Sequence, residues 1–138
     1  MNKKLLHVEL DFDFKLIALT SPSKDYRLCF AINKFTESDF RKTEDLEISL
    51  KNAPKKFFSR YVYYPENIEC EFIFLANKGN EGFLIPEMKA VDYFILIKEF
   101  IDEEDLELFL SQLKQLNEIQ AVVELDPEKI KSKENLIF

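Results

Sequence analysis

The sequence predicts an α+β fold: a ferredoxin-like plait with an added hairpin, in which an antiparallel sheet of about six strands packs against two main helices. Short runs that alternate apolar and polar residues recur along the chain, as they do in half-buried strands. Only two longer stretches place apolar residues three and four positions apart, which is the spacing of an amphipathic helix. One stretch follows the first predicted strand and the other precedes the last, which gives the order β-α-β-β-β-β-α-β.

A single domain is predicted over residues 1–138. Hydrophobic residues make up 46% of the chain, 14 of them Phe, so the chain can bury a core of its own. No repeat, low-complexity stretch or Ser/Gly/Pro-rich linker interrupts it.

The first strand is predicted at residues 10–19, with the first helix directly after it. Pro22 and the hydroxyl residues beside it are typical of a helix start, and the helix is expected to run through residues 25–33. Its apolar stripe consists of Leu28, Cys29, Ile32 and Phe35, widened by Tyr26 and Phe30. Most of the circumference of this helix is therefore expected to be buried.

Four strands are predicted in the middle of the chain, at residues 46–51, 57–64, 69–76 and 93–97. The first alternates cleanly and should have one solvated face, whereas the other three are apolar on both faces. Gly79 and Gly82 lie in the polar loop after the third, where they are expected to supply the positive φ angles of a hairpin.

The second helix is predicted to begin at Asp102, because further acidic residues follow it and suit the positive end of the helix dipole. Its buried face consists of Leu106, Phe109, Leu110 and Leu113. The last strand is predicted at residues 119–125, where the inward-facing residues are Ile119, Ala121, Val123 and Leu125. A short helical piece begins at Asp126, and the apolar residues 136–138 are expected to dock on the body of the protein.

Several kinds of catalytic and cofactor site are excluded by composition. Two glycines cannot build a phosphate-binding loop or a dinucleotide fingerprint. A single histidine, His7, leaves no Ser-His-Asp or Cys-His constellation. Two cysteines, Cys29 and Cys70, are too few and too far apart for a zinc site and lie in apolar stretches, as buried reduced thiols do. No cofactor or metal is therefore expected.

The charge and the apolar pattern indicate the compartment and the classes of partner. A net charge of −7 disfavours nucleic acid, because phosphate binding depends on Lys and Arg. No run of eighteen apolar residues is present, so no membrane segment is predicted, and the basic residues after Met1 are not followed by the apolar region of a signal peptide. A cytoplasmic location is expected.

Two acidic clusters have a metal-binding interpretation. Glu9, Asp11 and Asp13 alternate along the first predicted strand and could bind a divalent cation, although the solvent face of a strand explains them as well. The run at residues 102–105 lacks the alternating pattern and the central glycine of a calcium loop, and helix capping explains it.

The run Ile85-Pro86-Glu87-Met88-Lys89-Ala90-Val91-Asp92-Tyr93 concentrates a proline, two carboxylates and a phenol between a glycine turn and an apolar strand. The favoured hypothesis gives Glu87, Asp92 and Tyr93 structural roles, with the carboxylates accepting backbone amides and the phenol finding a hydrogen-bond partner. Two alternatives stay open. The three residues could form a ligand or partner site, or Glu87 and Asp92 could be the acid/base pair of a hydrolase.

This run resembles the signature of the bacterial IPExxxVDY family, with matches at residues 85–87 and 91–93. Residues 25–28 and 131–138 are similar to the family as well, so the resemblance spans nearly the whole chain. It implies a small cytoplasmic bacterial protein, and it transfers no catalytic residue.

The sequence favours a non-catalytic protein-interaction module that self-associates. The alternative is a small-molecule-binding regulatory domain with its ligand at a subunit interface. A homodimer is expected because three strands are apolar on both faces, whereas two helices on one side can cover only one of them.

Overall fold

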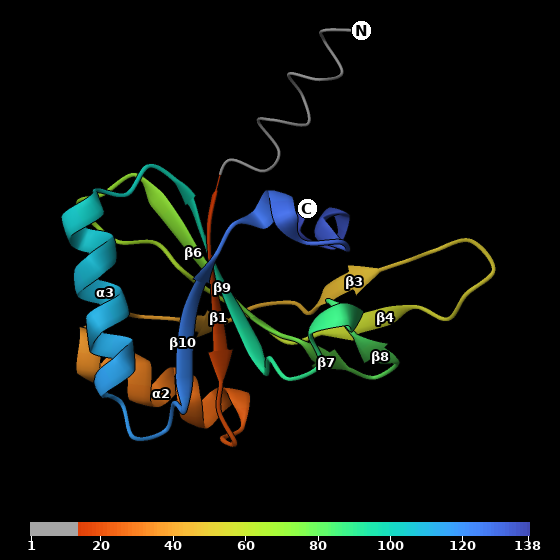
Figure 1. The fold of residues 1–138 in the computed structure, drawn as a ribbon, viewed down its shortest axis with the longest axis horizontal. Helices are drawn as coiled ribbons and strands as arrows, with labels where there is room; N and C mark the ends of the chain where they lie inside the picture. Colours follow the sequence, from red (N-terminus) through yellow and green to blue (C-terminus); the bar gives the residue numbers. More distant parts are fainter. Residues whose placement is uncertain (1–13) are drawn as a thin grey trace, which may run out of the picture.

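Six strands form the central sheet of the computed structural model, which describes residues 14–138 (Figure 1). These strands are β1 (Phe14–Thr20), β2 (Arg41–Lys42), β5 (Arg60–Tyr63), β6 (Cys70–Ala76), β9 (Tyr93–Glu99) and β10 (Ala121–Leu125). The two helices are α2 (Asp25–Thr36) and α3 (Glu103–Gln115). Two small hairpins pair β3 (Leu46–Ile48) with β4 (Lys56–Phe58) and β7 (Lys78–Gly79) with β8 (Gly82–Phe83). Three single 3-10 turns complete the fold: η1 (Pro86–Met88), η2 (Pro127–Lys129) and η3 (Lys133–Leu136).

The strands of the sheet follow the order β10-β1-β9-β6-β5-β2, and every neighbouring pair is antiparallel. β1 is thus a central strand, with β9 on one side and β10 on the other. The predicted α+β class, with a six-stranded antiparallel sheet and two helices, is confirmed. The predicted strand at residues 46–51 is shorter than expected and lies outside this sheet, in the β3–β4 hairpin.

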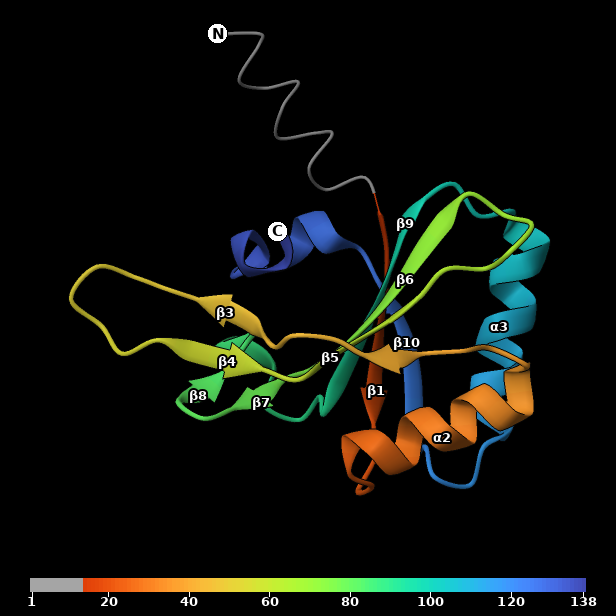
Figure 2. The same cartoon turned by 180° about the vertical axis from the view of Figure 1, so that it is seen from behind.

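Both helices cover one face of the sheet (Figure 2). Their buried residues include Leu28 and Ile32 of α2 and Leu106 and Leu113 of α3, the faces on which the helical spacing placed them. Aromatic rings from the sheet fill the space beneath; the rings of Phe72 and Phe109, for example, meet edge to face at 5.2 Å.

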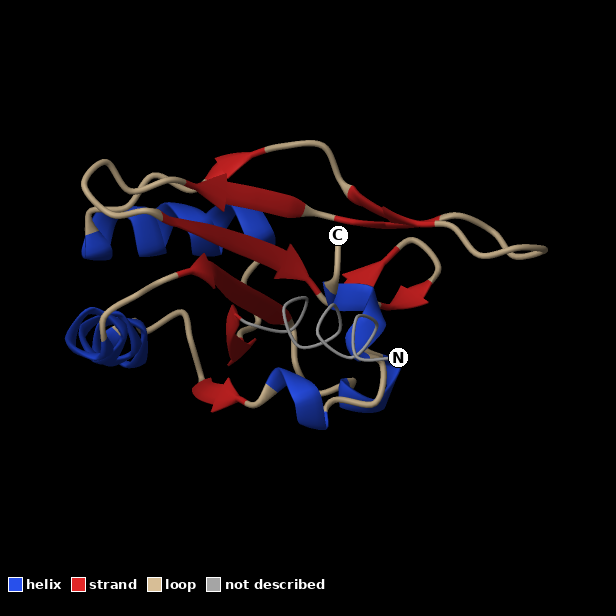
Figure 3. Ribbon diagram, turned by 90° about the horizontal axis from the view of Figure 1, so that it is seen from above, coloured by secondary structure: helices blue, strands red, loops and turns tan. Residues whose placement is uncertain are grey.

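The opposite face of the sheet is also apolar, and other segments of the same chain cover it. Its core joins strand residues such as Leu16, Ile73 and Phe94 to Phe58 of the β3–β4 hairpin and Leu136 of the C-terminal segment. Figure 3 shows the C-terminal turns and the two hairpins away from the helices. The expectation that two helices leave one face of the strands bare is therefore wrong, and a dimer is not needed to bury that face.

The β3–β4 hairpin reaches this face because its strands bend away from the sheet. Arg41 pairs with Val62 in β2–β5, whereas Leu46 pairs with Phe58 in β3–β4, so the register shifts by one residue between the two ladders. One extra residue on a single strand is the arrangement of a β-bulge, which bends a strand and increases its twist.

The two glycines of the next hairpin have different roles. Gly82 has a φ of 95°, as predicted for a hairpin turn. Gly79 does not have a positive φ, so the prediction for it is wrong. A Cβ atom there would collide with the carbonyl oxygen of Phe57 and approach the ring of Phe58 to 2.8 Å. Gly79 is therefore required because β7 packs closely against β4.

Two further expectations about burial are wrong. The rings of Tyr26, Phe30 and Phe35 are 57%, 69% and 44% exposed, so the buried stripe of α2 is narrower than the sequence indicated. At the last strand, Ile119 is buried, but Ala121 and Val123 are exposed. In α2, the buried residues Leu28, Cys29 and Ile32 form the single side that packs on the core. In β10, Val122 packs on the helix-side core, so Ala121 and Val123 point to the other face, and β10 is the outermost strand of the sheet.

Candidate functional site

The loop between β8 and β9, which contains the predicted site residues, is organised by Asn77. This side chain is fully buried at the end of β6. Its Nδ2 donates to the carbonyl oxygens of Met88 and Val91 at 2.9 and 2.8 Å, and its Oδ1 accepts the amide of Ile85 at 2.8 Å. Its backbone bonds to Leu84 and Asp92 as well. One amide side chain therefore satisfies three backbone groups of the loop.

Asp92 and Tyr93 hold the turn between β1 and α2. Oδ2 of Asp92 accepts the backbone N–H of Ser21 at 2.8 Å, and the hydroxyl of Tyr93 donates to the carbonyl oxygen of Ser23 at 2.6 Å. Burial, followed by the negative charges of Asp25 and Asp92, raises the pKa of Tyr93 to about 12. The phenol is therefore protonated at neutral pH and available as a donor.

Glu87 holds a different part of the chain. Its Oε2 accepts the backbone N–H of Ser132 and its Oε1 accepts the hydroxyl of the same residue, both at 2.7 Å. Desolvation raises the pKa of this carboxyl, but the bonds from Ser132 and the charge of Lys131 outweigh it, so the net pKa is lowered. Ser132 precedes η3, so Glu87 fastens the start of the C-terminal segment.

Glu87, Asp92 and Tyr93 therefore do not bind one common segment of the chain. Asp92 and Tyr93 bind the turn after β1, whereas Glu87 binds the C-terminal segment. These bonds support the structural interpretation of the run. They do not direct Glu87 and Asp92 toward a common point, as an acid/base pair would require. Sequence reasoning overlooked Asn77, the residue on which the loop depends. The available signal was an amide residue directly after the apolar run of β6.

The other sequence candidates are four residues near the N-terminus and the two cysteines. His7, Glu9, Asp11 and Asp13 lie outside the described residues. Within residues 14–138, no group of three His, Cys, Asp or Glu side chains could hold a metal ion.

Cys29 and Cys70 are free and buried, and burial raises the pKa of both thiols. No helix in the same described part of the chain is long and apolar enough to cross a bilayer.

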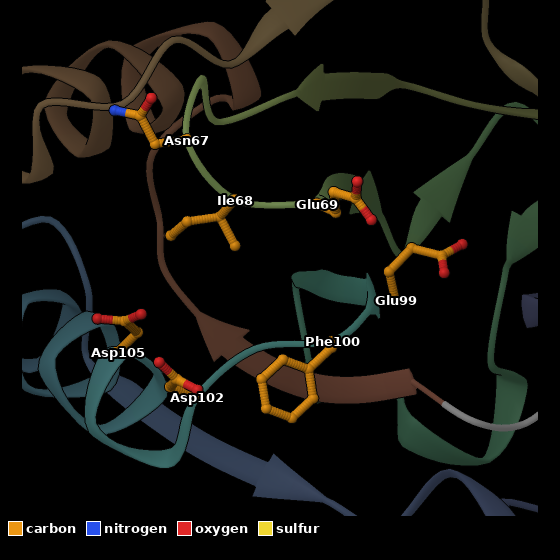
Figure 4. A pocket seen from close by; sticks show the side chains of 7 residues that line it. All are labelled: Asn67, Ile68, Glu69, Glu99, Phe100, Asp102 and Asp105. Atoms are coloured by element: carbon orange, nitrogen blue, oxygen red, sulfur yellow. The ribbon is translucent and has the colours of Figure 1, made fainter.

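An acidic cavity of about 380 Å³ lies at the N-terminal end of α3 (Figure 4). It is bounded by the turn that leads into β6 and by the turn that leads from β9 into α3. It is lined by Asn67, Ile68, Glu69, Glu99, Phe100, Asp102 and Asp105. All seven residues are exposed, and the ring of Phe100 is 72% accessible to solvent. In Figure 4 the glutamates lie on one side and the aspartates on the other, with Ile68 and Phe100 between them.

The four carboxylates of the acidic cavity have no ion-pair partner among the described residues. Asp102 does not cap α3 with its side chain, although it occupies the N-cap position. A shallow surface with unpaired negative charge around an exposed aromatic ring suits a cation that carries an apolar stem, such as a Lys or Arg side chain.

No protein-family model, curated protein or solved structure matches this chain. Its function therefore has to be inferred from its own residues.

Proposed function

We propose that this protein is a non-catalytic protein-interaction module and that its acidic cavity binds a basic segment of a partner protein. One observation carries the proposal: four carboxylates that have no ion-pair partner within residues 14–138 surround the exposed apolar side chains of Ile68 and Phe100. Like charges grouped on one surface repel one another, and a bound cation with an apolar stem relieves that repulsion and covers the ring of Phe100.

The shape of the acidic cavity favours a macromolecular partner over a small ligand. Ligand sites enclose most of their ligand and usually contain a few buried polar groups. Here every lining residue is exposed. The buried polar side chains of residues 14–138 are Ser21 and Asn77, and both are occupied by structural hydrogen bonds. The alternative, a small-molecule-binding regulatory domain with its ligand at a subunit interface, has no comparable observation in its favour.

Three further attributes belong to the same proposal. A ferredoxin-like plait with an added hairpin is supported by the strand order β10-β1-β9-β6. In it, α3 connects the parallel strands β9 and β10 across β1, and α2 follows β1 and precedes β6, with β2 to β5 inserted between α2 and β6. Membership of the bacterial IPExxxVDY family is supported by residues 85–87 and 91–93. A cytoplasmic location is supported by the two free thiols. Self-association completes the proposal.

The test is affinity capture from cells that produce the protein, with partners identified by mass spectrometry. The cavity variant Glu69→Lys/Glu99→Lys should lose a specific set of partners that the parent captures. Glu81→Lys/Glu107→Lys makes the same change in net charge at exposed positions outside the cavity and should retain that set. Phe100→Ala should weaken capture without changing the charge.

The salt dependence gives a second criterion. Capture through unpaired carboxylates should weaken as salt is raised, because screening shortens the range of the attraction. The proposal fails if the cavity variant captures the same partners in the same yield as the control variant.

A further inference from the structure

We propose that the outer edge of β10 pairs antiparallel with β10 of a second copy, which joins the two sheets into one across a two-fold axis. This inference rests on the self-association that belongs to the proposed function, and it names the surface and the partner. The surface is separate from the acidic cavity.

No strand within residues 14–138 pairs with the outer edge of β10. β10 is the last strand on its side of the sheet, and its ladder to β1 runs from Thr20↔Ala121 to Leu16↔Leu125. Outside this ladder, residues 121–125 form no backbone hydrogen bond with any other described residue. Val123 is 51% exposed, and Ala121 and Glu124 are exposed too. A row of unpaired backbone donors and acceptors is a template for another strand.

The two edges of the sheet differ in how they resist such pairing. β2, at the opposite edge, is two residues long and consists of Arg41 and Lys42. Short edge strands and basic side chains are the usual protection against strand addition. β10 has five residues, contains no Lys, Arg or Pro, and has the sequence Ala-Val-Val-Glu-Leu. β-Branched residues at its centre favour the extended conformation.

The occupant that β10 fits is a second β10. An antiparallel strand is complementary to itself across a two-fold axis, because each residue then meets its partner in a reciprocal pair. Full overlap of the five residues places Val123 opposite Val123 of the second copy and Glu124 opposite Val122. The two Glu124 carboxylates are therefore not directly opposed, which avoids the like-charge pairing that destabilises sheets.

The charge of the protein gives this dimer a distinctive salt dependence. Each copy has a net charge of −7, so two copies repel one another at low ionic strength. A contact built from backbone hydrogen bonds and valine side chains should therefore strengthen as salt is raised. Capture of a basic partner by the acidic cavity should change in the opposite direction. A five-residue ladder buries little surface, so the dimer should be reversible.

The first experiment measures the mass of the purified full chain by light scattering across the micromolar range, at low and at high salt. The parent should show a concentration-dependent dimer that increases with salt. Val123→Lys should be monomeric, because it introduces a charge at the centre of the pairing. Leu108→Lys, at a residue 57% exposed on α3, is the matched control and should dimerise like the parent.

The second experiment tests the register by cross-linking. Directly opposed residues in an antiparallel pair have Cα atoms about 4.5–5.5 Å apart, within the range that a disulfide spans. Val123→Cys should therefore form a disulfide-linked dimer under mild oxidation, whereas Leu108→Cys should not. The two native cysteines are buried and should contribute no background.

Two results would overturn the inference: a parent that remains monomeric at every concentration and salt, or a Val123→Lys variant that dimerises as the parent does. Either result leaves the proposed partner binding standing if Glu69→Lys/Glu99→Lys still loses partners that its control retains. Conversely, a salt-strengthened dimer without any cavity-dependent partner would remove the partner-binding part of the proposed function and keep this one.

Discussion

Nδ2 of Asn77 donates a hydrogen bond of 2.8 Å to the carbonyl oxygen of Val91, fourteen positions further along the chain. The bond ties the end of β6 to the residues that lead into β9, the strand with which β6 pairs along its full length. The loop can therefore leave the sheet, form the β7–β8 hairpin and η1, and return in register. The segment from Ile85 to Val91 is therefore folded around the buried amide side chain of Asn77.

Replacing Asn77 should be among the most damaging single changes in the protein. Asn77→Ala leaves the buried amide of Ile85 and the carbonyl oxygen of Val91 without partners and removes one of the two bonds to the carbonyl oxygen of Met88, which should lower the free energy of unfolding by about 3 kcal/mol. Urea unfolding followed by circular dichroism measures this loss. Asn67→Ala, at an exposed asparagine, is the control and should change stability by less than about 0.5 kcal/mol. Equal stability of the two variants would contradict the role assigned to Asn77.

Asp92 should contribute to stability and not to partner binding. Asp92→Asn weakens the acceptor for the Ser21 amide and should lower the free energy of unfolding by about 1 kcal/mol, and Asp92→Ala by about 2 kcal/mol. The melting temperature should fall while the folded fraction retains its partners. Asp39→Asn, in an exposed ion pair with Arg41, should have almost no effect. Unchanged stability with lost partner capture would make Asp92 a functional residue.

The high pKa of Tyr93 should make the protein sensitive to alkali. Its folded pKa of about 12 lies above the ordinary value of 10.0, so its contribution to stability is complete below pH 10 and is lost as the pH rises toward 12. Burial raises the pKa of Tyr61 and Tyr63 in the same direction. Unfolding by urea at several pH values should show a steep loss of stability in this window.

Tyr93→Phe tests the assignment of that loss. It removes the hydrogen bond to Ser23 and should cost about 1 kcal/mol at neutral pH. Between pH 10 and 12 it should lose less stability than the parent, because one ionisable phenol is gone. The control is Tyr26→Phe, at a ring that is 57% exposed. If the alkaline profiles of Tyr93→Phe and the parent were identical, Tyr93 would have no part in the transition.

The C-terminal segment should be required for stability. Leu136 is fully buried and Asn135 donates to the carbonyl oxygen of Leu84 at 2.8 Å, so the predicted docking of the tail is confirmed. Leu136→Ala should cost about 2–5 kcal/mol, and deletion of residues 136–138 should cost more or cause aggregation. Phe138→Ala, at a ring that is 42% exposed and lies against Lys98, should cost about 1 kcal/mol or less. A deletion variant as stable as the parent would show that the segment does not bury this face.

The sequence predicted those elements whose signal is local. α3 begins after Asp102, as its acidic first turn indicated, and β6 and β9 coincide with runs of apolar residues. The helix start predicted at Pro22 was too early, because α2 begins at Asp25 and the turn before it is held by Asp92 and Tyr93 instead. That interaction spans some seventy residues, and no local pattern specifies it.

The coverage of the second face depends on contacts of the same long range. Nothing local in Phe58 or Leu136 shows that they meet on one side of the sheet. The same holds for the acidic cavity, since Ile68 and Phe100 are distant in sequence and come together only because β6 and β9 are neighbours. The pattern at residues 85–93 indicated its carboxylates as the important groups, whereas the loop is organised by the amide side chain of Asn77, which precedes the run.

The central position of β1 has a consequence for the synthesis of the protein on the ribosome. Both of its neighbours, β9 and β10, come from the last third of the chain. The side chains of β1 are apolar on both faces of the strand. During translation, both edges of β1 stay unpaired until β9 and β10 have been synthesised. Emerging chains with exposed strands of this kind are prone to aggregate and are the substrates that chaperones protect. The order in which the segments leave the ribosome thus keeps β1 unpaired until the last third of the chain has been made.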